Sequence, residues 1–158
     1  MKAATLNELK REIKEIPQQK LLDTVIRLIK YKKENKELLT YLLFEADDEG
    51  AYIKGIKDEI YAQYKEMNKN HIQYVKKGLR KILRMVNKHI KFSGKKETEA
   101  ELLIYYCEKL KDSGIRFHRH TILLNLYERQ IIKIRKAVST LHEDLQYDYM
   151  RRIERLED

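Results

Sequence analysis

The sequence predicts an all-α protein, and composition and apolar periodicity are the two observations that predict it. Its 158 residues include one proline and five glycines, so few residues are suited to the tight turns between strands. Leu, Ile, Lys, Glu and Arg dominate, which is typical of long helices. Apolar residues recur at spacings of three and four. We therefore expect a single all-helical domain over residues 1–158, with seven to eight helices in antiparallel hairpins, forming a helical bundle or a short armadillo- or HEAT-like stack.

The first helix is predicted to begin after Thr5 and to end near Glu15. Thr5 and Glu8 form a capping box, in which each side chain reaches a backbone amide of the other residue. Pro17 then starts a second helix, because proline suits the first turn. The apolar stripe of this second helix contains Leu21, Leu22, Val25, Ile26, Leu28 and Ile29.

A third and a fourth helix are predicted between residues 35 and 67. Asn35 is expected to cap the third helix, whose apolar residues are Leu38, Leu39, Leu42 and Leu43. The acidic segment 47–49 either ends this helix or places carboxylates in the first turn of the fourth. The apolar residues of the fourth helix are Ile53, Ile56, Ile60, Tyr64 and Met67. Residues 68–70 are a predicted break.

A strongly basic helix is predicted from about His71 to Phe92. No Asp or Glu lies between Glu66 and Glu97. At about 100° per residue, the apolar side chains of this helix fall on one face. A cationic ridge about 20 Å long lies opposite, at about 1.5 Å per residue. The candidate polyanion-binding residues of this ridge are Lys77, Arg80, Lys81, Arg84, Lys88 and Lys91.

The C-terminal part is predicted to hold two or three more helices. Segment 93–94 ends the basic helix, with Gly94 suited to a left-handed conformation. A second capping box, Thr98 with Glu101, is expected to start a helix that ends at Ser113-Gly114; its apolar face is Leu102, Leu103, Tyr106 and Leu110.

The next predicted helix begins near Thr121 and is apolar on nearly all sides at first, which indicates a central position. Over residues 139–144 two alternatives stay open. Thr140 with Glu143 is suited to cap an eighth helix, while Leu145, Tyr149, Ile153 and Leu156 continue the same apolar stripe, as in one long kinked helix.

Three apolar segments near the N-terminus resemble a known family. They are Leu6-x-x-Leu9, Leu21-Leu22-x-x-Val25-x-x-Leu28-Ile29 and Glu34-Asn35-Lys36-Glu37-Leu38-Leu39-x-x-Leu42. In these roughly forty residues the chain is similar to a family of small bacterial helical proteins that has no assigned activity. The resemblance implies a helical fold and supplies no functional residue.

No motif predicts catalysis, and no cofactor or metal is expected. Cys107 adjoins an apolar stripe and is interpreted as a small buried residue, because no base or cationic neighbour marks it as a nucleophile. His118-Arg119-His120 is interpreted as a polar turn, since residues two apart diverge by about 200° on a helix. Gly50, Gly55 and Gly78 are too scattered to form a phosphate-binding loop.

The formal net charge of +9 favours a polyanionic partner. The leading hypothesis is a non-enzymatic binding or adaptor protein that contacts nucleic acid through the ridge, with Tyr74 and Phe92 flanking it for stacking on unpaired bases. The alternatives are an acidic protein as partner, a solvated helix face, or a structural or protein-interaction module, for which a homodimer through an exposed apolar stripe on the C-terminal helix is one form. An enzyme stays open as a third class, because helical enzymes can assemble sites from residues scattered along the sequence. The N-terminal segment lacks an apolar leader core and no apolar run spans a bilayer, so a cytoplasmic location is expected.

Overall fold

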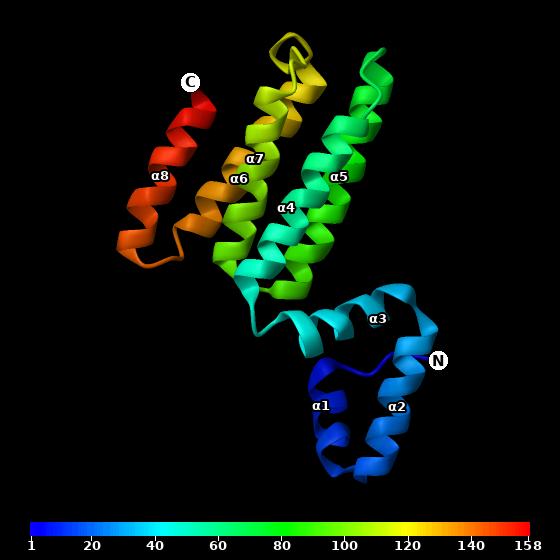
Figure 1. Cartoon of the computed structure of the whole chain (residues 1–158). Coiled ribbons are helices and arrows are strands. Elements are labelled where there is room, and N and C mark those ends of the chain that lie inside the picture. The colour runs from blue at the N-terminus through cyan, green and yellow to red at the C-terminus, as the bar shows by residue number, and fades with distance from the viewer. The chain divides into compact units, whose positions relative to one another are not determined.

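The computed structural model describes residues 1–158, and it is all-α with eight α-helices (Figure 1). The prediction of seven to eight helices is therefore confirmed. The backbone divides into two compact units, residues 1–44 and 45–158, which we describe separately as unit 1 and unit 2. A single domain over residues 1–158 stays a prediction.

Unit 1 contains α1 (Leu6–Glu15), α2 (Gln18–Tyr31), α3 (Lys33–Thr40) and the beginning of a π-helical turn, Tyr41–Glu45. The predicted capping box of α1 is confirmed, because the Glu8 amide donates to the Thr5 hydroxyl and the Thr5 amide donates to the Glu8 carboxylate at 2.7 Å. Pro17 is the residue before α2, as predicted for a helix start.

The predicted cap of α3 is wrong. The helix begins at Lys33 and its N-cap is Lys32, so Asn35 lies inside the first turn. The Asn35 side-chain amide instead donates to the Leu28 carbonyl of α2 at 2.7 Å. This bond satisfies an acceptor near the end of α2 and ties the two helices together.

None of the residues of α1, α2 or α3 is buried. The face of α2 that meets α3 is half-buried, whereas Leu6, Leu9 and Ile13 of α1 are 48 to 66% exposed. Leu22 and Ile26 of α2 are also exposed. Within unit 1, the apolar side chains of α1 therefore have no enclosed core.

Unit 2 is built around α6 (Lys96–Asp112), which packs against four other helices. These are α4 (Glu49–Glu66), α5 (Ile72–Ser93), α7 (Thr121–Val138) and α8 (Glu143–Glu157). The predicted apolar face of α6 is confirmed and extends around the helix. Its fully enclosed side chains are Ala100, Leu102, Leu103, Ile104, Tyr106, Cys107 and Leu110.

The prediction that α7 is the central helix is wrong. Ile122 and Ile132 of α7 are 53% and 66% exposed, although Leu123 and Ile134 are buried. Helix α7 covers α6 with one face and leaves the other in solvent. The apolar residues that suggested a central helix are divided between a core face and an open face.

Helix pairs stack against one another in unit 2. Helix α4 packs on α5, α6 packs on both of them, and α7 and α8 pack on α6 and on each other. Figure 1 shows the five helices running side by side as successive hairpins. This arrangement confirms the predicted bundle of helical hairpins.

Several helix ends of unit 2 differ from the predictions. Asp48 is the N-cap of α4 and accepts from the Ala51 amide at 3.1 Å, so the acidic segment belongs to the start of that helix. Gly94 ends α5 at a φ of 68°, as predicted. Lys95, not Thr98, precedes α6, and Thr98 is buried in the first turn, where its hydroxyl donates to Glu49 at 2.6 Å.

The chain breaks between α7 and α8, which decides between the two alternatives for residues 139–144. Thr140 does not cap α8, because its hydroxyl donates back to the Ala137 carbonyl at 2.7 Å. The residue before α8 is His142, whose Nδ1 accepts from the Asp144 amide at 3.3 Å. No helix of the chain combines the length and the apolar character that crossing a membrane requires.

Candidate functional site

Helix α5 presents one face to the core of unit 2 and the opposite face to solvent. Val75, Leu79, Ile82 and Val86 are buried against α4 and α6. Their spacing of three and four residues places them on one side of the helix. The predicted amphipathic character of α5 therefore exists in the folded protein, and its outer face is free to carry charge.

Five of the six predicted ridge residues are exposed and form no ion pair: Lys77, Arg80, Lys81, Arg84 and Lys91. The sixth, Lys88, is half-buried. We call these six residues the cationic ridge. Basic residues elsewhere in unit 2 are often neutralised, as the pairs Lys57–Glu101, Lys96–Glu99, Arg135–Glu157 and Arg152–Glu101 show. Five of the ridge residues thus concentrate positive charge that no ion pair offsets: Lys77, Arg80, Lys81, Arg84 and Lys91.

Two of the three lysines of α4 are paired with carboxylates. Lys57 pairs with Glu101 of α6 at 2.7 Å, and Lys54 pairs with Asp58 of its own helix at 3.4 Å. Lys65 is exposed near the end of α4. Two of the three lysines of α4 are therefore neutralised, while the unpaired cations of the ridge follow the axis of α5.

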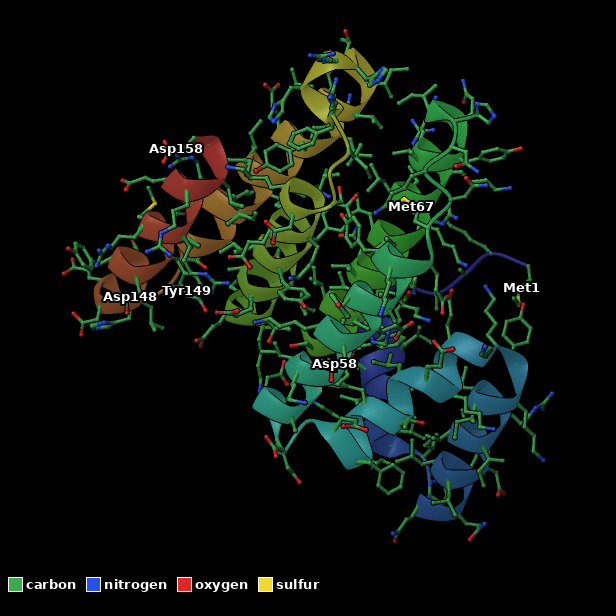
Figure 2. All side chains as sticks on the ribbon, turned by 45° about the horizontal axis from the view of Figure 1, so that its top comes forward. Met1, Asp58, Met67, Asp148, Tyr149 and Asp158 are labelled. Carbon is green, nitrogen blue, oxygen red and sulfur yellow. The ribbon has the colours of Figure 1, made fainter.

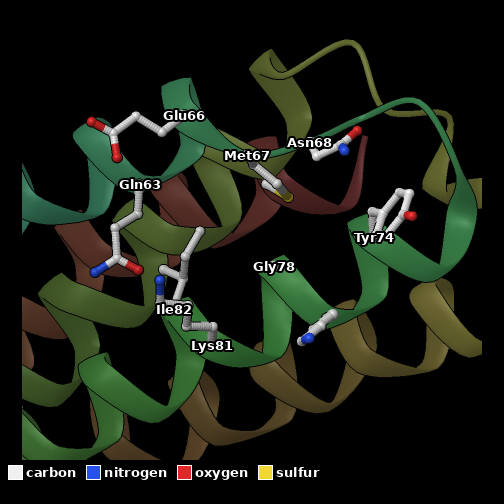
Figure 3. Close-up of a pocket in the computed structure, with 9 residues that line it drawn as sticks. Gln63, Glu66, Met67, Asn68, Tyr74, Gly78, Lys81 and Ile82 are labelled. Atoms are coloured by element: carbon white, nitrogen blue, oxygen red, sulfur yellow. The ribbon is translucent and has the colours of Figure 1, made fainter.

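A hollow of about 300 Å³ lies beside the ridge, between the end of α4 and the first half of α5. Figure 3 shows Met67 reaching across it toward Gly78, with Tyr74 at one end. A Cβ atom at position 78 would lie 2.6 Å from Met67 Cγ, so the absence of a side chain there admits Met67. The residues that line this hollow are Gln63, Glu66, Met67, Asn68, Tyr74, Lys77, Gly78, Lys81 and Ile82.

The two predicted stacking residues have different surroundings. The Tyr74 ring is 51% exposed and lines the hollow. Phe92 is half-buried, and its ring packs edge-on against His89 at 5.6 Å between centroids. His89 Nδ1 in turn lies 2.6 Å from the Tyr52 hydroxyl. Only Tyr74 combines exposure with a neighbouring recess, so Phe92 is mainly a packing residue.

A second polar cluster, which the sequence did not reveal, joins α4, α6 and α8 around Glu101. Its carboxylate accepts from Lys57 and Arg152, each at 2.7 Å, and from the Tyr149 hydroxyl at 2.9 Å. Figure 2 shows Tyr149 on α8. Burial by itself would raise the pKa of Glu101, but the Lys57 hydrogen bond and the charges of Arg152 and Lys57 together lower it below its ordinary value. The cluster is satisfied internally, so its role is to hold the three helices together.

Glu101→Gln is expected to destabilise unit 2 by about 1–2 kcal/mol near pH 7, because it leaves Lys57 and Arg152 half-buried without their shared carboxylate. The folded pKa of Glu101 is depressed, so its stabilising effect is fully present above the unfolded pKa and is lost as pH falls through the lower folded pKa. Urea unfolding at several pH values should show the difference shrinking below about pH 4.5. The exposed Glu154→Gln is the control; a difference that persists in acid would contradict the assignment.

The remaining chemical candidates are structural. Cys107 is fully buried, and burial raises the pKa of its thiol, as expected for an inert residue. Tyr64 and Tyr106 link helices through their hydroxyls, which donate to the carbonyls of Tyr106 and Leu79 at 3.1 Å each. Residues 117–119 form a 3₁₀ turn before α7, in line with the predicted polar turn. No three His, Cys, Asp or Glu side chains are placed to hold a metal ion.

No family model, curated protein or solved structure matches this chain. The resemblance of the N-terminal segments to small bacterial helical proteins therefore stays a prediction.

Proposed function

We propose that this protein is a non-enzymatic, cytoplasmic nucleic-acid-binding or adaptor protein that contacts phosphates through the cationic ridge of α5. One observation supports it: five exposed cations without ion pairs follow one face of a single helix. From Lys77 to Lys91 the ridge is about 20 Å long at about 1.5 Å per residue. Duplex DNA carries one phosphate per about 3.4 Å of each strand, so a ridge of this length spans several phosphates.

The composition of the ridge favours binding without sequence readout. Lysine is a compact point charge, whereas specific contacts to guanine rely mainly on the planar, bidentate arginine side chain. Lys77, Lys81 and Lys91 therefore position the backbone, and only Arg80 and Arg84 have the geometry for bidentate contacts. We expect affinity for nucleic acid in general, with a strong dependence on salt.

The salt dependence of binding tests this proposal. Five phosphate contacts give a slope of about −4.5 in log affinity against log salt, at about −0.9 per contact. Duplex affinity should therefore fall by roughly several hundred-fold between 50 and 200 mM salt, measured by fluorescence anisotropy with a labelled duplex. Absence of binding at the lower salt concentration would reject the proposal.

A second candidate function is protein interaction by self-association. The C-terminal stripe does not support the form predicted from the sequence, since Tyr149, Ile153 and Leu156 are buried. Unit 1 favours self-association instead, because a unit of 44 residues rarely encloses a stable core alone and because α1 exposes its apolar side chains. The apolar side chains of α1 are spaced by three and four residues, as in helices that pair in a coiled coil: Leu6, Leu9 and Ile13. The charged residues of α1 also balance in sign, which suits a second copy of the chain: Glu8, Glu12, Glu15, Lys10, Arg11 and Lys14.

Light scattering after size exclusion tests self-association. The intact chain should have the mass of a dimer, while Leu9→Arg with Ile13→Arg should have the mass of a monomer, because both side chains lie on the exposed apolar face of α1. Exposed Lys10→Ala is the control and should remain dimeric. A monomeric intact chain would exclude this second function and would leave the first untouched.

A further inference from the structure

We propose that the hollow between α4 and α5 holds one unpaired base of a single-stranded nucleic acid whose phosphates lie on the cationic ridge. This inference rests on the proposed function and adds a class of ligand to it. The hollow is continuous with the ridge, because Lys77 and Lys81 belong to both. A strand that follows α5 would therefore pass directly beside the recess.

The walls of the hollow suit the face of an aromatic base. The half-exposed Tyr74 ring stands at one end, and Met67 and Gly78 supply apolar surface beside it, with the buried Ile82 behind them (Figure 3). Bases stack on aromatic side chains with little dependence on their identity, since every base has a π-face. The volume of about 300 Å³ lies at the lower end of the range that proteins use for small ligands.

Gly78 sets the shape of the hollow. Any larger residue there would force Met67 aside, since even a Cβ would lie 2.7 Å from the Met67 sulfur. With glycine, the Met67 side chain lies close to the backbone of α5, and the connection between α4 and α5 approaches the ridge. One wall of the recess is thus formed by one small residue and by one flexible side chain that directly follows α4.

Polar atoms in the hollow suit the edge of a base. Gln63 Oε1 is buried and accepts no hydrogen bond, while the amide nitrogen of the same side chain donates to Glu59 at 3.2 Å. A buried acceptor without a partner is unfavourable. Every base carries at least one N–H group on its pairing edge, and such a donor would satisfy Gln63 Oε1 once a rotation of the Gln63 side chain exposes that oxygen to the hollow. Asn68 Oδ1 already accepts from the Asn70 amide at 3.0 Å, so its amino group remains available as a donor.

The charges around the hollow decide on which side of it the sugar-phosphate backbone lies. Lys77 and Lys81 attract phosphates on the ridge side, whereas the Glu66 carboxylate repels them. In Figure 3, Glu66 and Tyr74 stand at opposite ends of the hollow. The backbone must therefore stay on the ridge and only a base enters. A paired duplex keeps its bases stacked inside the helix, so the hollow would distinguish single strands from duplexes.

Abasic oligonucleotides test this inference on the full chain. A labelled single strand and the same strand with abasic sites carry equal numbers of phosphates and differ only in bases. Removing the bases should weaken binding roughly tenfold, as expected for the loss of one stacked base. Tyr74→Ala should weaken binding of the intact strand by a similar factor, should have no further effect on the abasic strand, and should leave duplex binding unchanged.

Two control variants separate stacking from other effects. Tyr74→Phe keeps the ring and should bind like the unmodified protein. Tyr61→Ala removes a ring that is equally exposed, at 51%, but lies outside the hollow, and it should also bind normally. Equal affinity for intact and abasic strands, with duplex binding retained, would overturn the base-binding inference and leave the proposed function standing. Absence of binding to every strand and duplex would overturn both.

Discussion

Charge reversal at Lys77, Arg84 and Lys91 is expected to lower duplex affinity about a thousandfold at 50 mM salt. Each lost phosphate contact removes about 0.9 from the salt slope. The slope should therefore fall from about −4.5 to about −1.8 in the variant Lys77→Glu, Arg84→Glu, Lys91→Glu. The three positions are exposed and unpaired, so their replacement breaks no ion pair of the fold. Fluorescence anisotropy across a salt series measures both quantities.

Helix α7 offers a matched control for this experiment. Arg129, Lys133 and Lys136 are exposed, form no ion pair and share one face of α7. Their replacement by Glu changes the net charge of the protein by the same amount and again involves one Arg and two Lys. If only the ridge variant loses affinity, the binding surface is on α5. If both variants lose affinity equally, total charge attracts the duplex and the ridge has no special role.

The sequence predicts the exposed positions of five ridge residues correctly because the determinants of these positions lie within one helix. The positions of Lys77 to Lys91 relative to Val75 follow from the helical repeat alone. The same segment contains no Asp or Glu that could pair with these cations. Gly94 and the Thr5–Glu8 capping box were predictable for the same reason. In each case the residues that decide the local structure are four or fewer positions apart, or share one helix.

Two of the wrong predictions concern side chains that bond to a neighbouring helix. Thr98 resembles a helix cap, yet its hydroxyl donates to Glu49, which is 49 positions away. Asn35 likewise donates to Leu28 of the preceding helix. A capping pattern and a buried polar contact use the same residue types, so local spacing cannot distinguish them. The tertiary partner decides between the two.

The hollow and the Glu101 cluster could not be predicted for a related reason. The hollow is lined by Met67, which follows α4, and by Gly78 of α5, over which Met67 packs. The cluster joins Lys57, Glu101 and Arg152, which lie on three different helices. Neither has a repeating pattern along the chain. The same limit explains why α7 was expected to be central: apolar residues all round a helix do not reveal which neighbours cover them.

Ile104→Ala is expected to destabilise the folded protein by about 2–5 kcal/mol. Ile104 is fully enclosed on α6, the helix that packs against α4, α5, α7 and α8. Removing its branched side chain leaves a cavity that these helices cannot close without moving, and the lost contacts and the cavity both contribute. Since native domains are stable by only about 5–15 kcal/mol, the midpoint of urea unfolding should move substantially. Far-UV circular dichroism gives the measurement.

Ile132→Ala is the matched control, because it makes the same change on an exposed face of α7. Ile132 is 66% exposed, so little burial is lost, and alanine favours the helix by a few tenths of a kcal/mol. Its free energy of unfolding should stay within about 0.5 kcal/mol of that of the unmodified protein. Similar midpoints for the two variants would refute the central position of α6. The Ile104 variant should still bind nucleic acid wherever it remains folded, because the ridge lies on the outer face of α5 and depends on α6 only for support.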